Sequence, residues 1–142
     1  MPKFAFSNFQ PFEITYKGII FPTAEHFYQA LKSTDQADWG RIAALPTPKE
    51  AKQEGRKLDI RPDWETKKID VMRIALELKF APGTPYHELL MATGDLEITE
   101  WNNWHDRYWG KCRCHIHQGS GENHLGRLLM EIRTKYQTTG AT

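Results

Sequence analysis

The segment Phe21–Lys32 constrains the fold more than any other part of this chain. Thr23 follows a proline and stands where a helix N-cap is expected. Apolar residues then recur at the spacing of one helix face: Ala24, Phe27, Tyr28 and Leu31. The segment therefore predicts a helix that begins at Thr23 and packs one apolar face against the rest of a domain.

A neighbouring face of this helix carries Glu25, Gln29 and Lys32 at i, i+4 and i+7. A carboxylate in the first turn is stabilised in its charged form by the helix dipole. An anion, an amide and an ammonium on one face are suited to form a wall of a polar site. From helix periodicity alone, the commoner interpretation is an ordinary amphipathic helix whose charged face meets solvent.

Alternation and turn signals predict the other elements. Residues 12–16, the turn Lys17-Gly18 and residues 19–21 predict a β-hairpin. Four further helices are expected: one at about 35–45, one from Thr47 to about Arg56, one at 63–80 and one from Thr84 to Gly94. A strand is expected at Glu97–Trp101, a long loop at 102–121 and a final helix from near Asn123. The predicted class is helix-dominated α+β: a single compact domain over residues 1–142, with about six helices around a small sheet.

The longest predicted helix, 63–80, has one stripe of mostly apolar side chains. Trp64, Lys68, Val71, Ala75 and Leu78 share this stripe, and Met72 and Leu76 widen it.

Charge and composition limit the classes of function. The 19 basic and 18 acidic residues give a net charge of +1, which argues against a general nucleic-acid binder. We expect no membrane partner, because no apolar run approaches a membrane span and the N-terminus shows no signal-peptide core. The two cysteines are separated by one residue, so a disulfide scaffold is not expected. These features predict a cytoplasmic protein.

The loop 102–121 contains three glycines, two tryptophans and both cysteines, which is more typical of a functional site than of a tether. We expect the part between Trp109 and Asn123 to be a mobile lid that gates substrate entry. The less favoured alternative is a structural clip held by zinc, which thiolates and imidazoles bind well. Its candidate ligands are Cys112, Cys114, His115 and His117, and His105 and His124 lie nearby in sequence. This spacing matches no standard zinc motif and needs a very tight turn, so no metal is expected.

Short motifs spread over nearly the whole chain occur in a specific order. They are Phe6-Ser7-Asn8-Phe9, Pro22–Ala30, Lys32, Gly55-Arg56, Trp64, Met72, Lys79-Phe80, Leu89-Leu90, Thr93, Glu100, Asp106, Trp109-Gly110, Gly119, Gly121, Asn123, Leu125-Gly126 and Leu129–Arg133. Together they resemble the NADAR family, the YbiA-like N-glycosidases.

The resemblance implies a hydrolase, without a cofactor, that cleaves the N-glycosidic bond of a phosphorylated ribosyl-amine. YbiA-like members act on ribosylaminopyrimidine phosphates of riboflavin synthesis, so a small phosphorylated nucleotide-like substrate is expected. One alternative is an ADP-ribosyl-guanine hydrolase that acts on ADP-ribosylated nucleic acid. The others are a non-catalytic module that binds ADP-ribose or NAD, and a chain that keeps the fold without activity.

Carried over position by position, the resemblance implies that Glu25 and Asp106 are catalytic. It implies substrate-binding roles for Trp64, Trp109, Glu100, Asn123, Lys32, Arg56 and Asn8. An anion near C1′ stabilises the oxocarbenium charge that develops on the sugar, and carboxylates also serve as general acids or bases. Tryptophan faces stack on flat bases. Cationic side chains at Lys32 and Arg56 suit a phosphate, although such cations are often only surface contacts. We expect Glu25, Trp64, Asp106 and Trp109 to line one cleft.

Overall fold

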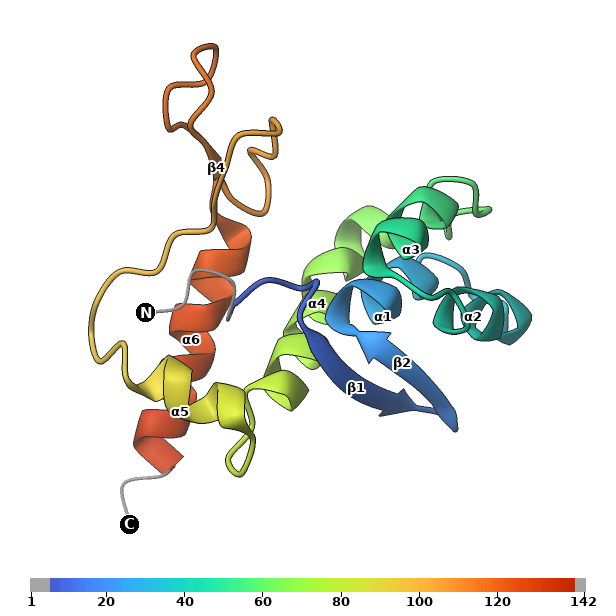
Figure 1. Cartoon of the computed structure of the whole chain (residues 1–142), viewed down its shortest axis with the longest axis horizontal. Coiled ribbons are helices and arrows are strands. Elements are labelled where there is room, and N and C mark those ends of the chain that lie inside the picture. Colours follow the sequence, from blue (N-terminus) through green and yellow to red (C-terminus); the bar gives the residue numbers. More distant parts are fainter. Residues whose placement is uncertain (1–5, 140–142) are drawn as a thin grey trace. The chain divides into compact units, whose positions relative to one another are not determined.

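The structure is a computed structural model that describes residues 6–139 (Figure 1). Within them lie six helices and four strands: β1 (Pro11–Tyr16), β2 (Ile19–Thr23), α1 (Ala24–Ala30), α2 (Gln36–Ala43), α3 (Pro48–Gly55), α4 (Trp64–Lys79), α5 (Pro85–Met91), β3 (Trp101–Asn102), β4 (Lys111–Cys112) and α6 (His124–Thr139). The helix-dominated α+β class is therefore confirmed. The strands form two separate two-stranded sheets rather than one.

The chain divides into two compact units, Met1–Phe80 and Ala81–Thr142, and each is described by itself. The first unit holds β1, β2 and α1 to α4, and the second holds the remaining elements. A single domain over residues 1–142 stays a prediction. None of the helices between residues 6 and 139 combines the length and the apolar character that crossing a membrane requires.

The predicted hairpin of the first unit is confirmed. Strands β1 and β2 pair antiparallel, with Tyr16 opposite Ile19. The two-residue turn places Lys17 at φ 49° and Gly18 at φ 80°. Two positive φ angles in succession match the twist of the flanking strands, which is why such turns close hairpins well. The hairpin leads directly into α1.

Helix α1 begins where the sequence predicts, but it is buried on every side. The Thr23 side chain caps it by accepting a hydrogen bond from the backbone N–H of His26 (3.1 Å). The buried His26 ring donates from Nε2 to the Leu45 carbonyl (3.0 Å), and burial lowers its pKa. All seven residues of the helix are buried, including Glu25 and Gln29. The interpretation of α1 as a helix with a solvated charged face is therefore wrong.

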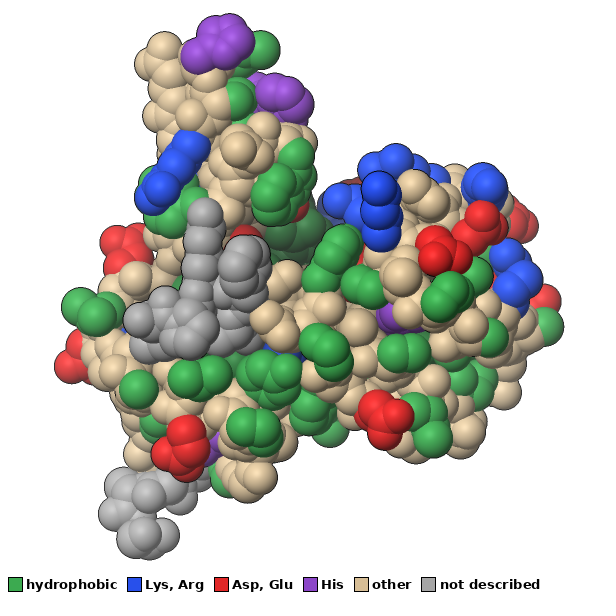
Figure 2. All heavy atoms as spheres, in the orientation of Figure 1, with side chains coloured by type: hydrophobic (Ala, Val, Ile, Leu, Met, Phe, Trp, Pro, Cys, Tyr) green, Lys and Arg blue, Asp and Glu red, His purple; other side chains and the backbone are tan. Residues whose placement is uncertain are grey.

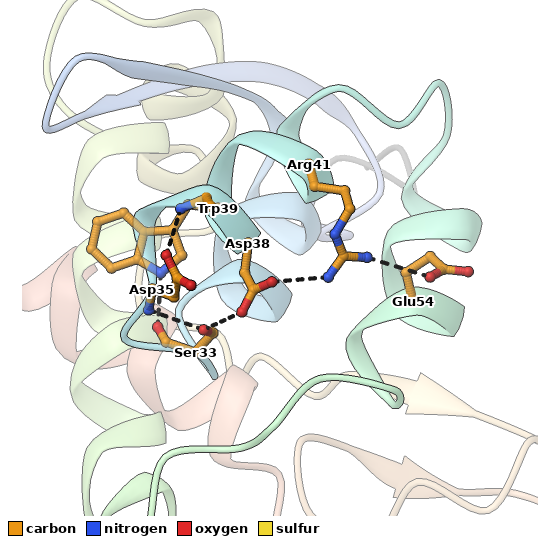
Figure 3. Close-up of polar contacts among 7 residues, drawn as sticks. Ser33, Asp35, Asp38, Trp39, Arg41 and Glu54 are labelled. Carbon is orange, nitrogen blue, oxygen red and sulfur yellow. Dashed lines mark hydrogen bonds and ion pairs between the residues drawn. The ribbon is translucent and has the colours of Figure 1, made fainter.

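Polar contacts connect the end of α1 with α2 and α3 (Figure 3). Asp38 accepts hydrogen bonds from the Ser33 hydroxyl (2.7 Å) and from Arg41 (3.0 Å). Arg41 also approaches Glu54 of α3 (3.7 Å). The Trp39 indole N–H donates to the Ser33 carbonyl (2.7 Å). These contacts hold the short helices around α1, which is too short to be stable alone.

Helix α4 buries a stripe that differs from the predicted one at its end. Its buried residues are Trp64, Val71, Met72, Ala75, Leu76 and Lys79. Leu78 is 43% exposed, so its place in the predicted stripe is wrong. Lys79 takes the inward position, because it lies four residues after Ala75, and its ammonium donates to the Ser7 carbonyl (2.7 Å).

The second unit packs α5 and α6 around a small core that includes Leu90, Leu129 and Ile132. The buried Arg133 of α6 donates to the Thr93 hydroxyl (2.8 Å) and to the Leu96 carbonyl (2.7 Å). Strand β3 pairs parallel with β4. The strand predicted at 97–101 is wrong in extent, since of these residues only Trp101 lies in a strand.

Candidate active site

Glu25 places a carboxylate in the interior of the first unit. Glu25 is 7% exposed and lies in the first turn of α1. Its Oε1 accepts a hydrogen bond from Gln29 Nε2 (2.9 Å), and its backbone N–H donates to the Asn8 carbonyl (3.1 Å). A buried carboxylate is costly unless hydrogen bonds and favourable fields compensate, and the amide and the helix dipole supply both.

The Gln29 amide has its place because residue 55 is glycine. A Cβ at Gly55 would collide with the Gln29 side chain. The amide therefore packs against the end of α3 and stays aimed at Glu25. Within the described residues, the buried oxygens Gln29 Oε1 and Asn8 Oδ1 have no hydrogen-bond partner. Asn8 Oδ1 is therefore an available hydrogen-bond acceptor close to Glu25, because the Asn8 carbonyl binds the Glu25 backbone N–H. A hydroxyl group of a ligand could donate to this oxygen.

Three cations of the first unit act electrostatically on Lys32. Burial lowers the pKa of Lys32; the charge of Glu25 opposes this shift, and the charges of Arg56, Lys52 and Lys68 add to it. Figure 2 shows Lys and Arg side chains gathered over α3. Like charges so close repel one another, so an anion placed among them would be stabilised.

This cation cluster (Lys32, Lys52, Arg56 and Lys68) has little internal charge compensation. Lys68 pairs with Glu65 (2.6 Å), whereas Lys32, Lys52 and Arg56 form no ion pair within residues 6–139. A structural pairing of Arg56 with the acidic helix surface is therefore not formed. The resemblance pointed to Lys32 and Arg56 but missed Lys52 and Lys68, although the spacing of Lys52 and Arg56 along one helix face was a signal in the sequence.

Trp64 lies at the start of α4 and is 6% exposed. Its ring packs on Tyr28 of α1, with centroids 5.1 Å apart and the planes tilted by 57°. Tyr28 in turn lies 5.8 Å from the Lys32 ammonium. Trp64 thus supports the helix that carries Glu25 and Lys32, while stacking of its face on a base stays a prediction.

In the second unit, Asn102 organises the loop that carries Asp106. The buried Asn102 amide donates to the Asp106 carbonyl (2.8 Å), and its oxygen accepts from the backbone N–H groups of Trp104 (3.2 Å) and Asp106 (3.1 Å). Gly110 permits this approach, because a Cβ there would strike Asn102 and the Glu100 carbonyl. Asn102 was missed from the sequence, since one asparagine in a polar loop gives no pattern.

Asp106 is held by the turn that follows it. Its Oδ1 accepts from the backbone N–H groups of Tyr108 (3.0 Å) and Trp109 (2.9 Å). Within the described part of this unit, its Oδ2 has no hydrogen-bond partner. One carboxylate oxygen thus fixes the side chain and the other remains for a ligand, as a positioned acid or base requires.

Trp109 sits beside Tyr108 and His124 at the start of α6. The Tyr108 and Trp109 rings meet edge-on with centroids 4.9 Å apart, and Tyr108 lies 4.4 Å from the His124 ring. An open cavity of about 570 Å³ is lined by Arg107, Tyr108, Gly121 and Glu122. Of the three rings, only Tyr108 lines this open cavity.

Asn123 connects the segment at Glu100 with α6. Its Oδ1 accepts from the Glu100 backbone N–H (2.9 Å), and its Nδ2 donates to the Ile98 carbonyl (2.9 Å). It is 3% exposed and adopts φ 56°. A Cβ at Gly126 would strike both Asn123 and Ile98, so glycine is needed there for this close packing. These contacts give Asn123 a positioning role, and its direct contact with substrate stays a prediction.

The predicted site residues thus form two groups. The first unit brings together Glu25, Lys32, Arg56, Trp64 and Asn8 through the contacts of α1, and the second brings together Asp106, Trp109, Glu100 and Asn123. The prediction that Glu25, Trp64, Asp106 and Trp109 line one cleft stays a prediction. Of the four zinc candidates, Cys114 and His117 converge with His105, whereas the exposed His115 does not belong to this cluster.

Comparison with known proteins identifies the family. The model of the NADAR domain matches residues 1–137. N-glycosidase YbiA of Escherichia coli (strain K12) is 38% identical over 130 residues, which are 90% of this chain and 78% of that protein. N-glycosidase Npun_R5314 of Nostoc punctiforme is 39% identical over 137 residues, which cover 93% of this chain and 85% of that protein. Riboflavin biosynthesis protein VVA0006 of Vibrio vulnificus is 35% identical, but the match covers only 35% of that protein.

The NMR structure of E. coli YbiA has a similar fold. It matches with a TM-score of 0.81 and 34% sequence identity over 96% of this chain and 80% of YbiA. The chain belongs to the NADAR family, and it is an enzyme of the N-glycosidase class.

The role of Asn123 is testable through stability. Asn123→Gly tolerates the positive φ angle but leaves the buried Glu100 N–H and Ile98 carbonyl unpaired. We expect a loss of about 2–4 kcal/mol in the free energy of unfolding, measured by urea denaturation. Asn103→Gly, at an exposed asparagine of the same unit, is the matched control. Equal stability of the two variants, with a raised KM only for Asn123→Gly, would instead make Asn123 a direct substrate ligand.

Proposed function

We propose that this enzyme hydrolyses the N-glycosidic bond of a phosphorylated ribosyl-amine, of the kind found in ribosylaminopyrimidine phosphates. The observation that carries this proposal is a buried carboxylate whose charge acts on a half-buried cation of the cation cluster. Glu25 and Lys32 are seven residues apart in the chain, and Lys32 lies within the cation cluster. Lys32 follows the end of α1, and the charge of Glu25 opposes the lowering of its pKa by burial, so both groups can contact one small ligand.

The chemistry of such a substrate fits the Glu25 carboxylate and the cation cluster. When the bond between C1′ and nitrogen breaks, its electron pair leaves with the nitrogen and positive charge develops on the sugar. A fixed carboxylate stabilises that charge most strongly where water is excluded, and Glu25 is such a group. The cation cluster suits the phosphate, whose oxygens accept charge-assisted hydrogen bonds from guanidinium and ammonium groups.

The remaining steps need a second carboxylate. Water must add its oxygen to C1′ and lose a proton, while the leaving nitrogen must gain one. Following the resemblance, we assign this proton transfer to Asp106, whose Oδ1 is held by two backbone N–H groups. Trp109 and its aromatic neighbours supply the stacking surface for the base.

The name of the Vibrio relative supports a substrate from riboflavin synthesis. The proposal keeps the cytoplasmic location expected from the sequence, and both cysteines are free thiols, which suits a reducing compartment. It requires neither a cofactor nor a nucleic-acid partner.

Glu25→Gln tests the central residue. The two side chains are nearly isosteric, so substrate binding, measured by calorimetry, should stay close to that of the unchanged enzyme. Loss of the anion should lower kcat by roughly 10²- to 10³-fold, by analogy with removal of one preorganised electrostatic group. Glu13→Gln, at an exposed carboxylate of β1, is the control and should keep full activity. A kcat for Glu25→Gln close to that of the control would assign the central role to another residue.

Lys52→Met tests the cation cluster. Loss of one charge-assisted contact to phosphate should raise KM roughly 10-fold, with a smaller effect on kcat. Inorganic phosphate should also inhibit this variant less well.

Lys57→Met is the matched control, because Lys57 is 71% exposed and pairs with Glu54 (3.0 Å) just beyond α3. Similar KM values for the Lys52 and Lys57 variants would show that the phosphate binds elsewhere.

A further inference from the structure

Three potential metal ligands converge in the second unit, away from any role in the proposed reaction. One ligand atom from each of His105, Cys114 and His117 lies within 4.8 Å of the other two. Cys114 Sγ is 3.4 Å from His105 Nδ1, and the His105 and His117 rings lie 5.3 Å apart at 76°. Figure 2 shows histidine side chains over the loops on either side of β4.

The distance between Cys114 Sγ and His105 Nδ1 agrees with tetrahedral zinc. Zinc bonds of about 2.3 Å to sulfur and 2.0–2.1 Å to nitrogen place the two ligand atoms about 3.5 Å apart when the angle at the metal is tetrahedral. The separation between Cys114 Sγ and His105 Nδ1 therefore needs almost no change to receive the ion. Thiolate with imidazole is also the ligand set that zinc prefers.

Cys112 is the nearest further thiol for a fourth ligand, although its sulfur is not among the three ligand atoms that lie within 4.8 Å of one another. It is fully buried. The backbone N–H of Cys114 approaches Cys112 Sγ (3.5 Å). Two thiols and two imidazoles complete a tetrahedral set, and a closed set of four protein ligands is typical of a structural zinc site.

The backbone of residues 112–120 is already folded around this set. The backbone N–H of His117 donates toward Cys114 Sγ (3.4 Å), and such a hydrogen bond stabilises a metal-bound thiolate. The N–H of Gln118 donates to the Cys114 carbonyl (2.8 Å), and Cys112 and Ser120 pair across the turn. The tight turn that made zinc improbable from spacing alone is thus formed.

We propose that His105, Cys112, Cys114 and His117 bind one structural Zn²⁺ ion. The ion would link the β4 turn to the loop of His105, which directly precedes Asp106. It would therefore hold the segment that carries the second proposed carboxylate. This replaces the mobile lid expected from the sequence with a clip, and it exchanges His115 for His105 among the ligands.

Metal titration of the full chain tests the proposal. The protein is stripped with a chelator under a thiol-free reductant and then titrated with Co²⁺, followed by Zn²⁺. We expect one Co²⁺ per chain, with thiolate charge-transfer absorption and the visible bands of tetrahedral cobalt, and displacement by Zn²⁺. Saturating Zn²⁺ should raise Tm, because the ion binds the folded state.

Variants separate this site from adventitious binding. Cys114→Ser and His117→Ser should each lose the tetrahedral cobalt spectrum and the rise in Tm. His115→Ser should keep both, because His115 lies between them in the chain but outside the cluster. Absence of cobalt uptake by the unchanged protein would overturn the proposal even if the variants fail to fold. So would an equal loss of metal in His115→Ser and His117→Ser.

Discussion

Burial of the Glu25 carboxylate is the constraint on which the first unit depends. The group is 7% exposed in a seven-residue helix, so its charge must be compensated by neighbours that cannot move. Gln29 supplies the hydrogen bond, Gly55 leaves the space for that amide, and the Asn8 carbonyl anchors the helix start. Much of the surrounding packing thus serves to hold one anion in place. Such a group is costly for stability and valuable for chemistry that develops positive charge.

In the second unit, side-chain hydrogen bonds order a long segment that has little regular secondary structure. Two asparagine side chains take over hydrogen bonds that a sheet would otherwise form. Asn102 binds the backbone around Asp106, and Asn123 binds that of Ile98 and Glu100. The proposed zinc clip extends the same arrangement by a third cross-link. Rigid support of this kind keeps a catalytic side chain at a fixed position.

Local signals were sufficient to predict most elements of the fold. The threonine caps at positions 23, 47 and 84 and the turn at Gly18 mark ends that the structure confirms. Features that depend on tertiary contacts were not predictable. Three such features are the burial of the polar face of α1, the inward position of Lys79 and the approach of His105 to Cys114. Each of them depends on contacts with residues that are distant in the sequence or on other elements. The site residues came from the resemblance, and Lys52, Lys68 and Asn102 were found only in three dimensions.

In the proposed function, the buried carboxylate and the cation cluster serve one N-glycosidase reaction on a small phosphorylated ribosyl-amine. The most direct measurement uses chromatography to follow N-glycosidic cleavage by the purified protein on three substrates offered separately. They are a ribosylaminopyrimidine phosphate, which releases ribose phosphate, and DNA carrying ADP-ribosylated guanosine and NAD, which both release ADP-ribose. We expect the highest kcat/KM on the ribosylaminopyrimidine phosphate. Faster cleavage of the modified DNA or of NAD, or no cleavage of any of the three, would contradict the proposed function.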